Sequence, residues 1–425
     1  MTAEIAIMNK LGVALDADSA VTVETEAGQK VYNTVNKLFT LSKYQPVGIM
    51  IFGSAEIMRV PWEALIKLYR AKLSKRKLPT VKAYALDFIK YLEKNRTAFT
   101  LPEQRRYFTD TVEQYFRLVL TEINQAVQDA LGKKRKITSM DVAVIVNEKV
   151  NKHHQEWRKT KRLPLPSTQE SRIRRRYALE LNKIRQSVFK KLPISRAASG
   201  KLSKLAAWLF TKENFRVASS GVVFAGFGTR ETFPSLYSVR IEGLVLNKLK
   251  CMKHKEAKIH FDNEAAILPF AQSEMVATFV EGVDPFYQRT LEEYLRRLFD
   301  HYPRAIEKLL KMSAKVKAKI QKEGRTVLTD FLNAVEDYRG SRHVKPVLDA
   351  VRVLPKDELA AMAESLVNLT SFKRRVTMDA ETVGGPIDVA VISKGDGFVW
   401  IKRKHYFTKD LNPQFVANYF RDEKA

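Results

Sequence analysis

Cysteine is almost absent from this sequence, because Cys251 is the only one among 425 residues. A single cysteine excludes an internal disulfide and a zinc site built from several thiolates. Such usage fits a reducing compartment, and we expect a cytoplasmic location. We expect Cys251 to be an ordinary residue in a loop or at the end of a strand.

Long apolar runs are also lacking. No run approaches the length of a membrane span, and the first residues lack the apolar core of a signal peptide. We therefore expect no insertion into a membrane. No GxxxxGK[ST] motif occurs, so any ATP-driven step would need a separate protein. With 45% hydrophobic residues, the chain is long enough for one large or two ordinary globular domains.

Acidic residues are too few to balance the basic ones. The chain has 74 Lys and Arg against 47 Asp and Glu, a net charge of +27. Such an excess favours a polyanionic partner, meaning nucleic acid, an acidic protein or an anionic surface. About half of it lies in residues 151–216, which hold 18 Lys and Arg against 4 Asp and Glu. An acidic protein or nucleic acid is the expected partner at residues 133–216, although few aromatic residues are available to stack on bases. The alternative is that this segment is a solvated helical face.

The first 55 residues predict two β-hairpins that lead into a helix. Apolar residues alternate from Ile5 to Leu15, around a turn at Asn9 to Gly12. A second pair of strands is expected near Val35 to Leu41 and Val47 to Ile51. A helix follows the small residues that begin at Gly53.

Four groups in this region suggest a nucleophile. If Met1 is removed, Thr2 carries both a hydroxyl and a free α-amine. The pKa of an α-amine is about 7.7–8.0, and a nearby lysine such as Lys37 lowers it, so that the amine can activate its own hydroxyl. Asp18 would hold Lys37 in place, and the N–H of Gly53 would face a developing oxyanion. The alternative is that Thr2 is an ordinary second residue and Asp18 caps a turn.

The segments GVALDADSAVT, NKLFTL and IFGSAE resemble the start of a proteasome β-subunit, a member of the N-terminal-nucleophile hydrolase superfamily. Thr2 and Asp18 keep the family interval of sixteen residues between nucleophile and aspartate. Lys37 lies nineteen residues after Asp18, where the family has sixteen, which implies three extra residues in a hairpin. Lys30 is the other candidate, but Lys37 has the better local match.

A second block resembles the middle of the same family. Strands are expected at Gly221 to Ala225 and at Pro234 to Val245, with a further strand at Met275 to Glu281. A helix should follow from about Pro285 to Phe299, with Asp284 as its N-cap rather than a catalytic group. Where the family has a Ser-Gly turn near the nucleophile, this chain has Glu281-Gly282, which weakens that part of the resemblance.

The last matching block begins at Met378. Asp379 and Thr382 would stand for the family's aspartate and serine, which orient the terminal amine, ahead of Gly384-Gly385 and a long strand ending near Lys402. One extra residue, Val383, separates Thr382 from the glycines. The alternative is that Asp379 is a turn residue between a helix and a strand.

Other patterns complete the prediction. Periodicity predicts helices near Val81–Glu93, Leu101–Ala130, Arg172–Leu209 and Leu354–Arg375, a strand at Met140–Val150 and a linker at Lys161–Ser167. We expect the adjacent His153 and His154 to be solvated rather than to bind a metal.

The resemblance implies an α+β protein with a four-layer αββα sandwich. Its core would comprise residues 1–99, 217–299 and 351–405, with a basic helical insertion at 100–216, a second helical insertion at 300–350 and a tail at 406–425. The implied activity is hydrolysis of a peptide or amide by Thr2, with no cofactor and no metal. A homo-oligomer and a separate ATP-dependent unfoldase are possible partners. The alternatives are an inactive scaffold of the same fold and a nucleic-acid-binding protein.

Overall fold

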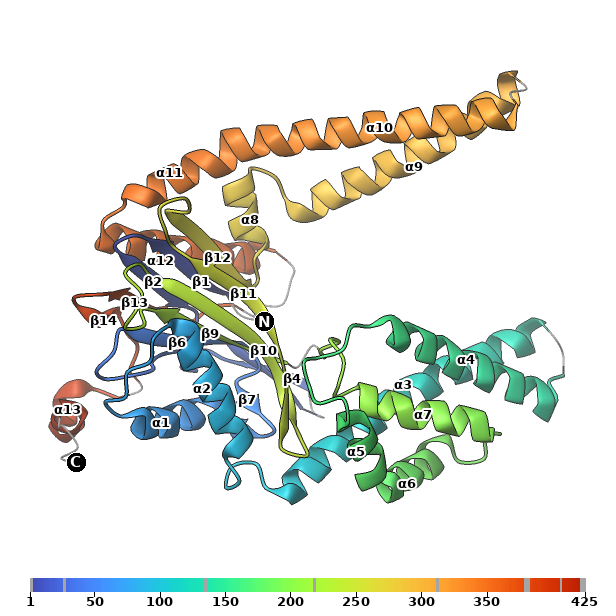
Figure 1. Ribbon diagram of the computed structural model, residues 1–425, viewed down its shortest axis with the longest axis horizontal. Helices are drawn as coiled ribbons and strands as arrows, with labels where there is room; N and C mark the ends of the chain where they lie inside the picture. Colours follow the sequence, from blue (N-terminus) through green and yellow to red (C-terminus); the bar gives the residue numbers. More distant parts are fainter. Residues whose placement is uncertain are drawn as a thin grey trace.

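The computed structural model describes residues 3–25, 28–133, 136–216, 219–310, 313–377, 383–405 and 407–420. The chain is an α+β protein, and its paired strands are antiparallel. Two five-stranded sheets form its centre (Figure 1).

The first sheet has the strand order β12-β1-β2-β13-β14. Its strands are β1 Ala3–Asn9, β2 Gly12–Ala17, β12 Ala265–Ala271, β13 Asp388–Ser393 and β14 Gly397–Lys402. The predicted first hairpin is confirmed, because β1 pairs with β2 around a turn between Asn9 and Gly12. The strand expected after Gly385 is a hairpin of two strands rather than one.

The second sheet has the order β11-β10-β9-β6-β5. Its strands are β5 Leu38–Thr40, β6 Val47–Gly53, β9 Ser220–Gly226, β10 Ser235–Val245 and β11 Lys248–Lys258. Four of these were predicted from the sequence, and three have nearly the predicted bounds, whereas β5 is shorter than the predicted Val35–Leu41. Two small hairpins, β3 Val21–Thr25 with β4 Gly28–Tyr32 and β7 Glu56–Ile57 with β8 Val60–Pro61, were not.

The two sheets pack face to face. Met8, Leu15, Met50, Val223 and Ile392 belong to one buried cluster that takes residues from both sheets. Because the other face of each sheet is covered by helices, all seven residues of β1 are buried. Because β1 is buried on both faces, most of its residues are apolar, on either side of the strand.

Helices cover the outer faces. Against the second sheet lie α1 Trp62–Leu73 and α2 Val81–Lys94, and their apolar stripes form one cluster with that sheet. Against the first sheet lie α8 Glu274–Glu281, α11 Lys345–Val353 and α12 Lys356–Val376. Segment 275–281 was predicted as a strand, which is wrong. Its apolar residues Val276 and Val280 are four apart and therefore lie on one face of a helix.

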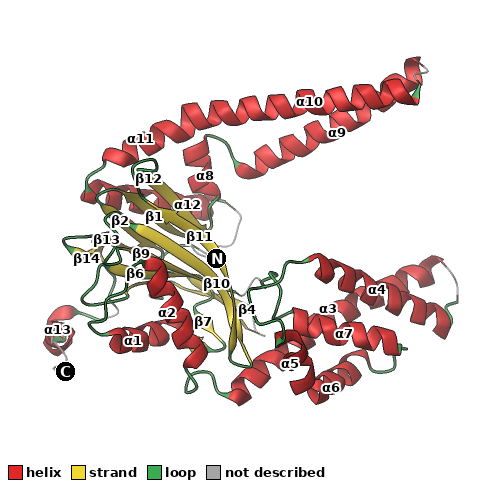
Figure 2. Ribbon diagram, viewed as in Figure 1, coloured by secondary structure: helices red, strands yellow, loops and turns green. Residues whose placement is uncertain are grey.

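A basic helical unit, defined here as α3 to α7, lies beside the sheets (Figure 2). Its helices are α3 Leu101–Lys133, α4 Ser139–Lys159, α5 Gln169–Arg176, α6 Ala178–Phe189 and α7 Arg196–Trp208. They share a buried cluster of their own, in which the rings of Phe108 and Tyr177 stack at 4.1 Å. The predicted single helix Arg172–Leu209 is three helices, and the predicted linker Lys161–Ser167 lies between α4 and α5.

Two expectations in the basic helical unit were wrong. Met140–Val150 is part of α4 and not a strand, because Val146, Val150, His153 and Trp157 recur every three to four residues and are buried. A capping box between Thr138 and Asp141 begins this helix. His153 is buried rather than solvated, with Nδ1 2.9 Å from the Tyr115 hydroxyl, and the ring of His154 lies 4.8 Å from that of Trp208.

A second helical excursion forms a long arm (Figure 1). It consists of α9 Pro285–Leu310, α10 Ala314–Arg339 and the π-helical turn Gly340–Val344, which continues into α11. The predicted N-cap is confirmed, because Asp284 Oδ1 accepts the N–H groups of Phe286 and Tyr287 at 2.9 Å each. Near the C-terminus lie a 3-10 turn Lys409–Leu411 and α13 Pro413–Phe420. The domain boundaries stay a prediction.

Candidate active site at the start of the chain

The carboxylate of Asp18 is the centre of the candidate site. Asp18 follows the last residue of β2 and is fully buried. Its Oδ1 accepts the N–H of Ala3 at 3.1 Å and the ammonium of Lys37 at 2.5 Å. Its Oδ2 accepts the N–H groups of Ala20 at 3.2 Å and Gly384 at 3.1 Å. Both oxygens are therefore occupied, and four separate points of the chain are held around one side chain.

Lys37 is held between two carboxylates. It precedes β5, and its carbonyl accepts the N–H of Ile51 on β6 at 2.9 Å. Its Nζ lies 2.5 Å from Asp18 and 3.6 Å from Oε1 of Glu4, and its side chain is 4% exposed. A buried ammonium is stable only when it is paired and hydrogen-bonded. Lys37 thus has one fixed position, next to the first described residues of the chain.

The start of the described chain lies within this cluster. Ala3 begins β1, which is hydrogen-bonded to β2 on one side and to β12 on the other, so its backbone position is set by both neighbours. Ala3 lies opposite Ala271, and its carbonyl accepts the N–H of Asp18 at 3.2 Å. Thr2 itself lies outside the described residues.

Gly53 lies at the same end of the second sheet as Lys37. It is the last residue of β6, two positions beyond Ile51, and is paired with Ser220 of β9. Its φ of +80° is in the left-handed region, and a Cβ here would lie 2.5 Å from the Ser219 carbonyl oxygen. Only glycine fits this position without strain.

The segment before β13 also contacts the cluster. Asp379 and Thr382 lie outside the described residues, which resume at Val383. Besides donating to Asp18, Gly384 accepts the N–H of Ser19 at 3.1 Å. The expected Gly-Gly segment is therefore hydrogen-bonded to the two residues that follow β2.

The turn beside the start of β1 is not the one that the sequence indicated. Glu281 ends α8 and is paired with Arg339 at 3.1 Å, while Gly282 is the left-handed C-cap of that helix with φ 74°. The strand that pairs with β1 ends earlier, at Ala271, and is followed by Gln272-Ser273. The sequence prediction placed the strand at Met275–Glu281, which is α8, instead of at β12, and the expected turn was therefore placed too late in the chain. Ser273 therefore follows the strand that pairs with β1, whereas Glu281-Gly282 ends the helix after it.

Sequence reasoning missed three charged residues in this region. Glu4 lies beside Lys37, and Asp388 forms a buried ion pair with Lys404 and accepts its N–H at 2.8 Å. Burial lowers the pKa of Lys404; Asp388 opposes this, and the positive charge of Lys37 adds to it. A signal for Glu4 and Asp388 was present, because each is a lone charge in an apolar strand.

Asp16 is a buried acid on the helix-covered face of β2. It is fully buried, and neither carboxylate oxygen has a hydrogen-bond partner within the described part of the chain. Burial raises its pKa well above the ordinary value, and the negative charges of Glu364 and Asp18 raise it further. The folded protein therefore favours the neutral form of the Asp16 acid.

Lys30, the other candidate lysine, and Cys251, the single cysteine, lie in strands that supply none of the hydrogen bonds to Asp18 described above. Lys30 lies in the β3–β4 hairpin, with its ammonium 5.1 Å from the centre of the Tyr32 ring. Cys251 lies within β11, where burial raises its thiol pKa to about 11, so that little thiolate forms at neutral pH.

The comparisons with known proteins do not identify the chain. No protein-family model matches its sequence, and no curated protein matches it either. Among the described residues, no helix has both the length and the apolar composition needed to cross a membrane. Within the same residues, no three His, Cys, Asp or Glu side chains gather as metal ligands.

Proposed function

We propose that this protein is an N-terminal threonine hydrolase of the proteasome-like type, with Thr2 as the nucleophile after removal of Met1. One observation carries the proposal. The N–H of Ala3 and the ammonium of Lys37 share a single oxygen of Asp18, at 3.1 and 2.5 Å. The residue before Ala3 is one peptide unit from this point, which would bring its amine and hydroxyl near Lys37.

The proposed reaction is hydrolysis of a peptide or amide. The hydroxyl of Thr2 would attack the carbonyl carbon, its own amine would take the proton and return it to the leaving amine, and water would then release the ester intermediate. The charge of Lys37 favours the neutral amine. The N–H of Gly53 would stabilise the oxyanion, and Asp379 and Thr382 would orient the amine.

The arrangement of layers supports the fold that the proposal requires. Two antiparallel sheets share one buried cluster, and helices cover the outer face of each. We propose that this core is the four-layer αββα sandwich of N-terminal-nucleophile hydrolases. Ser273, at the turn after β12, would fill the role for which the sequence offered only Glu281-Gly282.

Intact-mass analysis of the purified full chain tests the proposal. We expect a mass that lacks Met1, and a covalent adduct with a peptidyl epoxyketone, which reacts with both the hydroxyl and the amine of an amino-terminal threonine. Thr2→Ala should abolish the adduct and the hydrolysis of a peptide library, and Thr2→Ser should keep both at a reduced rate. Thr121→Ala, at an exposed position of α3, is the matched control.

Retention of Met1 with no adduct would favour the alternative, an inactive scaffold of the same fold. Unchanged hydrolysis by Thr2→Ala would reject the mechanism outright. The melting temperature of each variant should equal that of the parent, so that loss of activity is not loss of folding.

A second candidate function, binding of a polyanion, is favoured by the surface of the basic helical unit. Arg172, Arg175 and Arg176 on α5 are exposed, and none of them pairs with a carboxylate of the described chain. Basic side chains that are not neutralised by neighbours attract phosphates or acidic side chains. This candidate is compatible with the hydrolase, since the two surfaces use different elements.

A further inference from the structure

The arm formed by α9 and α10 is an antiparallel helical hairpin. Near its middle, Arg325 of α10 lies 3.2 Å from Asp300 of α9. Lys317 pairs with Glu307 closer to the tip. From the base to the tip, the paired residue numbers rise on α9 and fall on α10, as expected for antiparallel helices. These pairs show which residues of the two helices lie opposite each other.

One face of α9 packs against one face of α10. Phe299 of α9 faces α10 at Gly324, where a Cβ would lie 3.2 Å from the Phe299 ring. Pro303 of α9 and Leu328 of α10 are buried. These residues form the contact within the hairpin.

A second apolar stripe on each helix is left exposed. Its six central members are 42–65% exposed, namely Leu291, Tyr294 and Leu298 on α9 and Val327, Phe331 and Val335 on α10. An isolated exposed apolar residue is ordinary, but a contiguous row along two helices indicates an interaction surface.

The two exposed stripes lie on the same side of the hairpin. Leu298 immediately precedes the inward Phe299, and Val327 immediately precedes the inward Leu328. In each helix, the side chain of the preceding residue is rotated by about 100° around the helix axis, in the same sense when each helix is viewed along its own chain direction. Because the helices are antiparallel, equal rotations turn both side chains toward the same side. Leu298 also lies level with Val327, since Phe299 meets Gly324.

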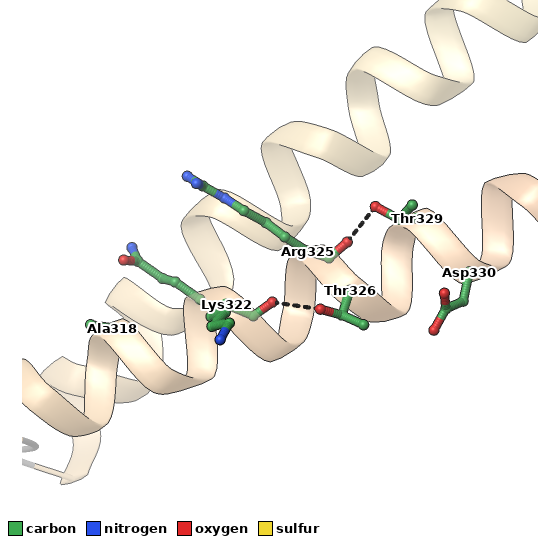
Figure 3. A pocket seen from close by; sticks show the side chains of 7 residues that line it. Ala318, Lys322, Arg325, Thr326, Thr329 and Asp330 are labelled. Atoms are coloured by element: carbon green, nitrogen blue, oxygen red, sulfur yellow. Dashed lines mark hydrogen bonds between the residues drawn. The ribbon is translucent and has the colours of Figure 1, made fainter.

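The opposite side of the arm is polar. A hollow of about 420 Å³ follows α10 there and is lined by Lys322, Arg325, Thr326 and Thr329 among others (Figure 3). The hydroxyls of Thr326 and Thr329 donate to the carbonyls of Lys322 and Arg325, at 3.3 and 2.8 Å. The arm thus has one apolar and one polar side.

Charge along the arm is unequal. Its tip half, residues 299–326, has 8 Lys and Arg against 3 Asp and Glu. Its base half, residues 281–298 and 327–344, has 5 Lys and Arg against 7 Asp and Glu. A partner that fits this surface is apolar in the middle, acidic over the tip and basic over the base.

We propose that the apolar side of the arm binds the same side of the arm of a second copy of this chain, in the opposite direction. This arrangement places each basic tip over the acidic base of the other arm and forms a four-helix bundle. Helices of 26 residues are about 39 Å long, enough for the 1,000 Å² or so that a stable interface buries. An anionic membrane fits less well, because it would repel the acidic base. The inference is independent of the proposed hydrolase.

The two-fold axis passes near Leu298, and single-cysteine variants test this directly. In a Cys251→Ser background, Leu298→Cys should form an oxidative cross-link between two copies. Tyr287→Cys, at the base, should not cross-link to itself, but should cross-link to Leu309→Cys when the two variants are mixed. Cross-linking of Tyr287→Cys to itself without that of Leu298→Cys would overturn the antiparallel arrangement.

The oligomeric state provides the second test. Sedimentation velocity of the full chain should show a dimer in the micromolar range. Leu298→Asp or Phe331→Asp should weaken dimerisation at least tenfold without lowering the melting temperature, because both side chains are already exposed in one chain. Thr326→Asp, on the polar side, should leave it unchanged. A monomer throughout that range, or equal effects of the three variants, would reject the proposal.

Discussion

The ammonium of Lys37 and the carboxylate of Asp18, 2.5 Å apart, connect the two sheets of this protein. Asp18 follows β2 of the first sheet, and Lys37 precedes β5 of the second. Both side chains are almost completely buried, so water can solvate the two charged groups only when the sheets separate. The same contact sets the position of the first described residue, Ala3, relative to the second sheet.

We expect Asp18→Asn to destabilise the protein by about 3–5 kcal/mol, because it leaves the buried charge of Lys37 without its closest partner. Urea unfolding followed by circular dichroism measures the effect. Adding Lys37→Met to that variant should recover part of the loss, since the uncompensated charge is then removed. A loss as large in the double variant as the sum of the two single variants would contradict this coupling.

An exposed ion pair is the control. Asp396 pairs with Lys356 at the surface, and Asp396→Asn should leave the unfolding midpoint close to that of the parent. Equal effects of Asp18→Asn and Asp396→Asn would show that burial of the first pair has no consequence for stability.

Gly53→Ala is expected to cost about 1–3 kcal/mol, because alanine is strained at a φ of +80° and its Cβ meets the Ser219 carbonyl. If the N–H of Gly53 stabilises the oxyanion, the rate of hydrolysis by Gly53→Ala should fall by more than the loss of folded protein accounts for. The matched control is Gly395→Ala in the turn between β13 and β14, where no atom lies within 4 Å of the added Cβ. Thermal unfolding of the two variants distinguishes local strain from a general effect of losing a glycine.

Asp16 should make stability fall as pH rises. Its pKa is raised in the folded protein, so the protonated acid is favoured there, and this contribution is complete below the unfolded pKa and lost as pH increases toward the folded one. Asp16→Asn should therefore gain stability relative to the parent as pH rises above the unfolded pKa of an aspartate, about 4. Unfolding curves across this range check the sign. A constant difference at every pH would contradict it.

The basic helical unit should bind polyanions in a salt-dependent way. We expect a fluorescent single-stranded RNA to bind at low salt and to dissociate as salt is added, with Arg172→Glu, Arg175→Glu and Arg176→Glu together reducing both affinity and salt slope. Lys315→Glu, Lys319→Glu and Lys322→Glu on the arm form the control set with the same change in charge. No binding at low salt would exclude nucleic acid, and equal effects of the two sets would exclude a local site.

Much of the sheet structure was predictable because buried strands have a local signature. The Ile5–Leu15 alternation led to the two strands of the first hairpin, and the runs Val47–Ile51 and Pro234–Val245 each led to a strand close to its observed bounds. The error at Met275–Glu281 has a physical cause. A short apolar run fits a helix or a strand equally well, and only packing against the first sheet decided for the helix.

The candidate site was predictable only in part. Spacing and local matches indicated Asp18, Lys37 and Gly53, and the structure brings the first two into contact. Glu4 and the Asp388–Lys404 pair were missed, although each acidic residue stands alone in an apolar strand. A lone charge indicates burial with a partner, but the partner comes from another strand, so the sequence cannot name it.

By itself, the sequence determined which segments are apolar on one face, where turns occur and how much positive charge the chain carries, because these depend on residues close together along the chain. Only the tertiary structure decided that the end of β2, the start of β5 and the segment before β13 meet at one buried carboxylate. It alone decided that the apolar stripes of α9 and α10 share one side of the arm. Both results depend on the direction in which separate elements pack, and no local pattern contains that information.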